Sequence, residues 1–240
     1  MKQALLLPGW GMEKDVFCSL IEAFEERVEF TFIDWRGIKT KAEYEARVIS
    51  TLRDMKDKVH LVGWSLGSIV ALNVVNQVPE KVAGIIIIGG TSRFTIGDDY
   101  AYGWHKRIVN RMKTNVKRDK DQTLRSFDLA MFSETEHKQG YYDQFVQIRN
   151  EQFQGDSTDS LEVGLQYLIE TDVRNILPII KVPCLIIHGE EDGITPVEAG
   201  KFINEQVGSE SSIYVLQDTG HMPFFTKADK CAQLMREFME

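Results

Sequence analysis

A serine set between two glycines is the first feature of the chain that could carry out chemistry. Residues 63–67 read Gly-Trp-Ser-Leu-Gly, a G-x-S-x-G pattern. The apolar run before it, residues 59–62, predicts a strand, and residues 66–77 predict a helix of apolar and small side chains. A sharp strand-to-helix turn exposes the serine hydroxyl, and the start of the helix favours negative charge nearby. The pattern predicts Ser65 as a nucleophile, the alternative being an ordinary glycine-bounded turn.

A serine nucleophile needs a base, and the chain has five histidines. His221 directly follows the last apolar run, residues 212–216, in the segment Asp-Thr-Gly-His-Met-Pro. It should therefore lie at the carboxyl edge of the predicted sheet, where the serine turn also opens. His221 is the predicted general base. The remaining histidines lie in or at the end of a predicted strand or in the long segment before residue 180: His60, His105, His137 and His188.

The base in turn needs a carboxylate that orients its ring. Asp192 is the predicted partner, because it lies in His-Gly-Glu-Glu-Asp-Gly directly after the penultimate apolar run. Glu190 and Glu191 are near alternatives. Asp218 is too close to His221 along the chain to approach the ring from the side.

An ester or amide attacked by serine passes through an oxyanion, which needs two N–H donors. Leu66, the residue after the predicted nucleophile, is the first candidate donor. Trp10 is the second, because it lies in the Leu-Pro-Gly-Trp-Gly loop at residues 7–11, where glycines let the backbone approach a substrate. Trp10 could instead be a core aromatic, and it can serve both purposes.

Composition places the chain among ordinary globular proteins. It has 240 residues, 43% of them hydrophobic, and a formal net charge of −8, which argues against general nucleic-acid binding. Its three cysteines form neither a disulfide framework nor a metal motif, and no metal or organic cofactor is expected. No apolar run is long enough for a membrane span, and the first residues do not resemble a signal peptide. We therefore expect a cytoplasmic, monomeric protein.

Short apolar runs alternate with helical patterns along most of the chain, which predicts an α/β fold. The six predicted strands are residues 3–7, 28–33, 59–62, 82–88, 182–187 and 212–216. Their near-continuous apolar character is typical of a mostly parallel sheet of about six strands with helices on both faces. The predicted helices outside the longest interval are residues 40–57, 66–77 and 224–239.

The longest interval between strands, about residues 91–180, contains no convincing strand and is too long for a connection. Its apolar spacing predicts four helices, the last with a capping-box-like start at Asp159. We interpret residues 91–180 as a helical lid inserted before the penultimate strand, and residues 1–90 and 181–240 as the core.

The order serine, aspartate, histidine and the turn motif resemble the α/β-hydrolase fold family over nearly the whole chain. Within that fold the chain is similar to the pimeloyl-[acyl-carrier protein] methyl ester esterases of biotin synthesis. The pieces that carry this similarity are PGWG at 8–11, GWSLG at 63–67, GLQYLIETDVRNIL at 164–177, GEEDGITP at 189–196 and GHMPF at 220–224. The resemblance implies cleavage of a methyl ester, with substrate contacts from Trp10 and from the lid residues Phe127 and Met131.

Three features depart from the family's pattern. Pro8 replaces the usual histidine before the first glycine of the 8–11 loop, and Ser68 replaces the second glycine after the turn. The chain also begins at the strand that leads into that loop, without the usual antiparallel hairpin before it. None of these differences removes a predicted catalytic atom, although the first two could reshape the pocket.

The predicted lid has a charge opposite to that of the whole chain. Residues 104–125 contain eight basic side chains and two acidic ones. This pattern predicts a docking surface for an acidic acyl carrier protein, the alternative being a solvated helix face. Nucleic acid is a weaker partner because no aromatic side chains are interleaved. The predicted docking residues are Arg107, Arg111, Lys113, Lys117, Arg118 and Arg125.

The sequence thus predicts a serine carboxylesterase that hydrolyses a methyl or other short ester of an acyl chain, and the resemblance implies the methyl ester of pimeloyl-acyl-carrier protein in biotin biosynthesis as its substrate. The same scaffold also supports thioesterases, general carboxylesterases and the menaquinone-pathway lyase that eliminates pyruvate. A non-catalytic binding protein with the hydrolase fold is the alternative outside the enzymes.

Overall fold

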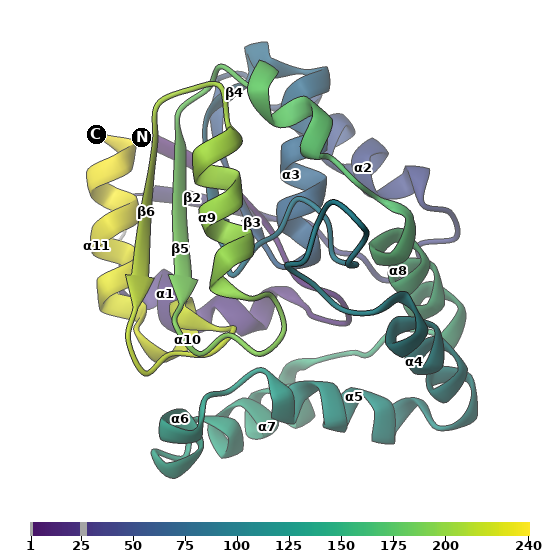
Figure 1. Ribbon diagram of the computed structural model, residues 1–240. Helices are drawn as coiled ribbons and strands as arrows, with labels where there is room; N and C mark the ends of the chain where they lie inside the picture. Colours follow the sequence, from purple (N-terminus) through teal and green to yellow (C-terminus); the bar gives the residue numbers. More distant parts are fainter. Residues whose placement is uncertain (1, 25–27) are drawn as a thin grey trace.

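A six-stranded parallel sheet forms the centre of the computed structural model, which describes residues 2–24 and 28–240 (Figure 1). The strands are β1 (Lys2–Leu7), β2 (Val28–Phe32), β3 (Val59–Trp64), β4 (Val82–Ile88), β5 (Cys184–Gly189) and β6 (Ser211–Leu216). Their spatial order is β2-β1-β3-β4-β5-β6, and every neighbouring pair is parallel. The predicted fold class is confirmed, and the sheet is parallel throughout rather than mostly so.

The four inner strands are the most apolar because helices cover both of their faces. One row of the sheet joins Leu5, Leu61, Ile85 and Cys184, each paired with the next across neighbouring strands. The outer strands β2 and β6 are only half-buried. This parallel register brings the carboxyl ends of all the strands to one edge of the sheet.

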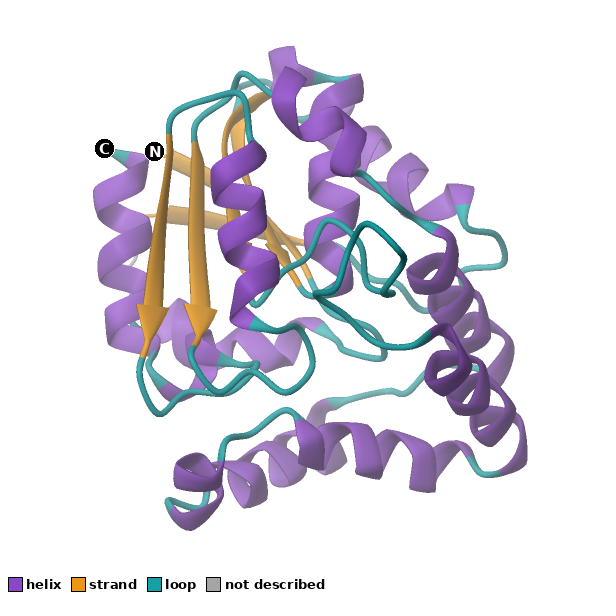
Figure 2. Cartoon of the chain, in the orientation of Figure 1, coloured by secondary structure: helices purple, strands orange, loops and turns teal. Residues whose placement is uncertain are grey.

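Helices pack on both faces of the sheet (Figure 2). On one face, α3 (Leu66–Gln77) contacts β3 and β4, α9 (Val197–Gln206) contacts β5 and β6, and α2 (Ala42–Asp54) packs against α3. On the other, α10 (Pro223–Thr226) and α11 (Ala228–Met239) contact β5, and both contact α1 (Cys18–Glu22). Short 3-10 turns cover Lys14–Phe17, Pro79–Lys81 and Arg174–Ile179.

The predicted helices of the core agree with the structure except at the C-terminus. There a single helix over 224–239 was expected, but Lys227 leaves the helical conformation (φ −130°, ψ 44°) and separates α10 from α11. Neither α1 nor α9 is predicted from the apolar pattern of the sequence. Both are short helices whose apolar positions are too few for a clear period.

Five helices lie between β4 and β5, where the sequence predicted four. They are α4 (Lys106–Arg118), α5 (Lys120–Ala130), α6 (Glu134–Lys138), α7 (Tyr141–Gln152) and α8 (Thr158–Glu170). We call them together the helical insertion. The last helix begins one residue earlier than predicted, because Ser157 caps it by accepting a hydrogen bond from Ser160 N. Figure 1 shows α5, α6 and α7 across the edge at which the strands end.

Candidate active site

Ser65 lies in the turn between β3 and α3, in a backbone conformation that is rare for a residue with a side chain. Its φ is 56° and its ψ is −119°, and its N–H donates to Ile88 O at 3.2 Å. A non-glycine residue held at positive φ is strained, and such strain is concentrated at functional sites. Ser65 is 5% exposed. The structure therefore has the strained turn that the sequence motif predicted.

The two glycines that flank Ser65 are required by close backbone contacts. A Cβ at Gly63 would lie 2.6 Å from Gly67 O, and a Cβ at Gly67 would lie 2.1 Å from Leu7 O. Neither distance can accommodate a carbon atom. The turn can therefore be this tight only with glycine at both positions.

Asp192, in the loop after β5, and His221, in the loop after β6, form a buried pair. Nδ1 of His221 lies 2.7 Å from Oδ2 of Asp192, and both side chains are 0% exposed. Oδ1 of Asp192 accepts the N–H groups of Ile194 and Thr195, each at 2.9 Å. Burial alone would raise the pKa of Asp192. The attraction of His221 and hydrogen bonds from neighbouring histidines outweigh burial and lower the pKa below its ordinary value.

The other ring nitrogen of His221, Nε2, is buried and has no hydrogen-bond partner among the described residues. The His221 ring lies 5.5 Å from the ring of Trp64, whose Nε1 donates to His221 O at 2.9 Å. Trp64 directly precedes Ser65 in the turn. The unpaired nitrogen and the strained serine thus occur at the same edge of the sheet.

The structure also separates the predicted carboxylate from its alternatives. Glu190 and Glu191 are exposed, whereas Asp192 is buried against the histidine. His188, at the end of β5, is fully buried, and its Nε2 lies 2.8 Å from Thr195 O and 3.4 Å from Asp192 Oδ2.

Thr195 is a member of this network that the sequence analysis missed. Its hydroxyl lies 2.9 Å from Asp192 Oδ2 and 2.7 Å from Gly89 O. Its place three residues after Asp192 is typical of a side chain that closes a turn, and this spacing is the signal that could have identified it.

The loop at residues 7–11 lies against the serine turn. A Cβ at Gly9 would lie 3.3 Å from Cβ of Ser65. Pro8 is the first departure from the family's pattern. Its carbonyl accepts the indole N–H of Trp35 at 2.8 Å, and this bond holds the loop in place. Leu66 is the first residue of α3, so its N–H has no partner within the helix.

Trp10 is buried, and its side chain connects the loop to the helical insertion. Its indole N–H donates to Leu161 O at 2.8 Å, and its ring meets Phe127 edge-on at 5.2 Å. The predicted core role of this side chain is therefore compatible with a backbone role beside Ser65.

Ser68, the second departure, has a structural function. Its hydroxyl donates to Ser65 O at 2.5 Å and accepts the N–H of Thr91 at 3.1 Å. It thereby joins the serine turn to the loop that follows β4. A glycine at this position could make neither bond.

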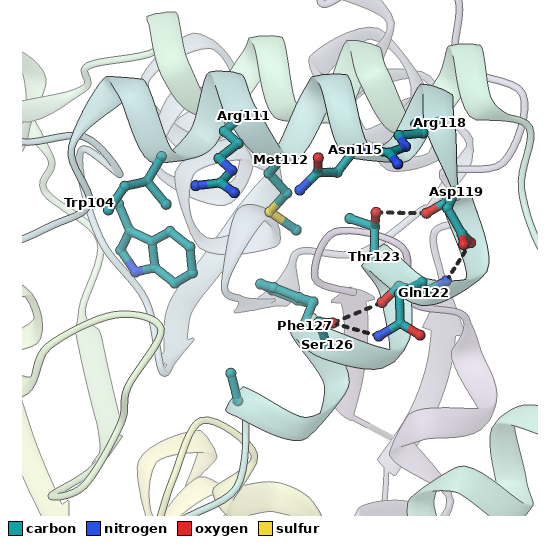
Figure 3. A pocket seen from close by; sticks show the side chains of 12 residues that line it. Trp104, Arg111, Met112, Asn115, Arg118, Asp119, Gln122, Thr123, Ser126 and Phe127 are labelled. Carbon is teal, nitrogen blue, oxygen red and sulfur yellow. Dashed lines mark hydrogen bonds between the residues drawn. The ribbon is translucent and has the colours of Figure 1, made fainter.

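A groove of about 460 Å³ lies between α4 and α5 of the helical insertion (Figure 3). Its apolar lining includes Trp104, Met112, Phe127 and Ala130. The indole N–H of Trp104 donates to Ile194 O at 2.8 Å, which places this end of the groove beside the Asp192 loop. Arg111 and Arg118 add positive charge to the lining.

The residues predicted for substrate and carrier contacts are distributed unevenly around this groove. Phe127 lines it, whereas Met131 is fully buried and is not part of the lining. Lys113 and Lys117 face Glu162 of α8, with Lys117 Nζ 3.0 Å from its carboxylate. The exposed predicted docking residues are Arg107, Arg111, Lys117, Arg118 and Arg125.

The described residues, 2–24 and 28–240, contain no group of three or more His, Cys, Asp or Glu side chains that could hold a metal ion. None of their helices is both long and apolar enough to cross a membrane.

The family follows from comparison with known proteins. A family model described as alpha/beta hydrolase fold matches residues 5–228. The chain belongs to this family. An esterase from Exiguobacterium antarcticum superimposes with a TM-score of 0.87 at 24% identity, covering 100% of this chain and 92% of that one. A bromoperoxidase from Bacillus anthracis gives 0.86 at 19% identity, covering 99% and 91% of the two chains.

Curated relatives of similar length share one description. A pimeloyl-[acyl-carrier protein] methyl ester esterase of Vibrio campbellii is 27% identical over 98% of this chain and 93% of that protein. One from Neisseria meningitidis is 24% identical over 100% of this chain and 94% of that protein.

Proposed function

We propose that this protein is a serine esterase with Ser65 as nucleophile, His221 as general base and Asp192 as the carboxylate that orients the base. The observation that carries the proposal is the buried Asp192–His221 pair, which leaves Nε2 of the ring without a partner beside the strained serine turn. Contacts between nucleophile and base are often loose without substrate and tighten when it binds.

The chemistry follows from these positions. Ser65 Oγ attacks the ester carbonyl, and His221 Nε2 takes the hydroxyl proton. Backbone N–H groups of Trp10 and Leu66 stabilise the oxyanion, helped by the N-terminus of α3. The C–O bond of the ester breaks, and the alcohol leaves with the proton from His221. A water molecule, deprotonated by the same base, then releases the acid and restores Ser65.

For the substrate we propose the methyl ester of an acyl chain attached to an acyl carrier protein. The name shared by the curated relatives supports this choice, and so does the chemistry of the groove. Its apolar lining suits methylene groups, with Phe127 as a contact. Trp10 meets Phe127 edge-on, and Met131 is buried outside the lining. Arg111 and Arg118 have no carboxylate within ion-pair distance among the described residues, so their charge is available to an acidic partner.

The proposed docking surface is narrower than the predicted set of six residues. Lys113 and Lys117 are partly neutralised by Glu162, so the main contribution comes from the arginines. The docking residues proposed are Arg107, Arg111, Arg118 and Arg125.

The test compares the methyl ester of a carrier-bound pimeloyl chain with a small free methyl ester, measuring the methanol released. We expect Ser65→Ala to abolish both reactions without changing the melting temperature by more than a few degrees. Full activity of Ser65→Ala would refute the serine mechanism. Failure of the wild type to react with a fluorophosphonate would favour a binding protein.

Reversing the charge of docking arginines tests whether an acyl carrier protein binds to this surface. The double variant Arg107→Glu/Arg125→Glu changes two exposed docking residues outside the groove lining. It should raise KM for the carrier-bound ester at least about tenfold at low salt, and leave cleavage of the free ester unaffected. Lys58→Glu, an exposed reversal at the amino end of β3, is the matched control. Cleavage of only the free ester would indicate a general carboxylesterase.

A further inference from the structure

A second buried carboxylate, which the proposed mechanism does not use, lies in the helical insertion. Glu136 of α6 is 1% exposed, and among the described residues no Lys, Arg or His lies within ion-pair distance of it. Burying a carboxylate without a cation is costly unless hydrogen bonds satisfy it. The hydrogen-bond donors to Glu136 therefore indicate why a carboxylate is buried at this position.

Glu136 accepts hydrogen bonds from three donors, and only one of them belongs to the start of its own helix, α6. Oε2 accepts Ser133 N at 2.8 Å, which is the ordinary bond of a capping box. Oε2 also accepts Gly220 N at 3.0 Å, and Oε1 accepts the hydroxyl of Thr226 at 2.5 Å. The last two donors flank His221 in the chain, one directly before it and one five residues after it.

Neighbouring residues of the insertion contact the same loop. Met131 O accepts His221 N at 2.7 Å, and the hydroxyl of Ser133 donates to Asp218 O at 3.0 Å. The packing is tight, because a Cβ at Gly220 would lie 2.5 Å from Met131 O. Segment 131–136 thus holds the backbone on both sides of the histidine.

Asp192 alone does not fix the position of His221. It contacts a single ring nitrogen, and the loop that carries the ring follows Asp218, which has a φ of 53°. The backbone that carries the ring is held by three bonds: Gly220 N to Glu136, His221 N to Met131 O, and the indole N–H of Trp64 to His221 O. A misplacement of about 1 Å in an active site can lower the rate about 100-fold.

We propose that Glu136 is a positioning residue for His221: its carboxylate, supplied by the helical insertion, holds the Gly220 N–H and so sets the base against Ser65. This inference rests on the proposed role of His221. It adds a direct connection between the insertion and the base, because segment 131–136 follows Ala130, which lines the groove.

The bonding pattern identifies the substitution that should preserve the function. In Glu136→Gln the amide oxygen can accept both backbone N–H groups, and the amide nitrogen can donate to the Thr226 hydroxyl, which accepts as well as donates. In Glu136→Ala all three bonds are lost. Glu136→Asp keeps the charge but is one methylene too short to reach the same donors.

The experiment measures kcat and KM on a small free ester for the three variants and the wild type. We expect kcat to fall about 100-fold in Glu136→Ala with KM little changed, and Glu136→Gln to restore most of it. The control is Glu134→Gln on the same helix, which removes only an exposed pair with Lys138. If the alanine variant does not fold, Glu136→Asp replaces it in the test, and kcat of the aspartate variant should also fall.

A second readout does not depend on esterase activity. The Nδ1 proton of His221 should give a low-field proton NMR signal in the wild type and in Glu136→Gln, and that signal should broaden or vanish in Glu136→Ala or Glu136→Asp. An unchanged kcat and an unchanged signal in a folded alanine or aspartate variant would overturn the proposal. If the wild type has no esterase activity the proposed function fails, and the NMR comparison still decides whether Glu136 orders the histidine.

Discussion

Oδ2 of Asp192 lies 2.7 Å from Nδ1 of His221, and neither side chain is exposed. The two residues come from loops after different strands, 29 residues apart in the chain. The parallel sheet brings these loops together at its carboxyl edge, and Thr195 and two backbone N–H groups satisfy the rest of the carboxylate. An aspartate held this way accepts from Nδ1 and leaves Nε2 free to receive a proton.

The first prediction concerns Asp192→Asn. The asparagine oxygen can replace Oδ1, but its amide nitrogen would then face Nδ1 of His221 and favour the tautomer that carries its proton on Nε2. That tautomer cannot take a proton from Ser65. We expect kcat for ester hydrolysis to fall about 10⁴-fold. Glu191→Gln, an exposed neutralisation in the same loop, should leave kcat unchanged, and equal losses in both variants would contradict the assignment.

The second prediction concerns acid stability. The pKa of Asp192 is lowered in the folded state, so its ionised form stabilises the fold at every pH above its unfolded value of about 3.8. This contribution is lost as the pH falls below that value, because the unfolded chain then binds the proton more readily. The free energy of unfolding, measured with urea between pH 6 and pH 3, should fall more steeply below about pH 4 in the wild type than in Asp192→Asn. Parallel curves would show that the carboxylate is not specially stabilised.

Much of the fold could be predicted because its signals are local. The strands are short runs of apolar residues, and the helix at 66–77 has the same bounds in the sequence analysis and in the structure. The placement of Ser65, Asp192 and His221 at one edge of the sheet was also predictable, because each follows a strand and parallel strands end at one edge. The short helices α1 and α9 were missed because they lack a long period.

The rest of the site depends on contacts between distant segments. Thr195 and Glu136 have ordinary local signals, a turn spacing and a capping box, but their partners Gly89 and Gly220 are 106 and 84 residues away. The pairing of Lys113 and Lys117 with Glu162 likewise requires α4 and α8 to be adjacent. The sequence gives charge and period, and only the fold decides which charges are neutralised.

The third prediction concerns the cysteines. Burial raises the pKa of Cys184 and of Cys231 to about 12, so almost no thiolate forms on either at pH 8. Cys18 is partly exposed. Iodoacetamide at pH 8 should therefore add at most one label to the native protein, at Cys18, and three after denaturation in urea. Mass spectrometry of tryptic peptides identifies the sites, and native labelling of Cys184 at the rate of Cys18 would contradict the burial.

The last prediction concerns a buried ion pair that joins α5 to α7. The guanidinium of Arg149 makes two 2.8 Å contacts with the carboxylate of Asp128, and also donates to Gly11 O at 3.4 Å beside Trp10. Burial raises the pKa of Asp128 to about 7, although Arg149 opposes the rise. Removing one member of a buried pair leaves the other uncompensated, so Arg149→Met should cost about 3–5 kcal/mol of unfolding free energy.

The sign of the pH dependence distinguishes this mechanism from lost packing. A carboxyl whose folded pKa is raised destabilises the fold increasingly as the pH rises from its unfolded value of about 3.8 toward and through its folded value. Arg149→Met removes the group that opposes the rise in the pKa of Asp128. The variant should therefore lose more unfolding free energy at pH 8 than at pH 5. The double variant Asp128→Leu/Arg149→Met should recover most of the stability and lose that pH dependence, because no charge remains buried. Urea unfolding at the two pH values measures the wild type and both variants, and an equal loss of unfolding free energy at both pH values in Arg149→Met would show that packing alone is involved.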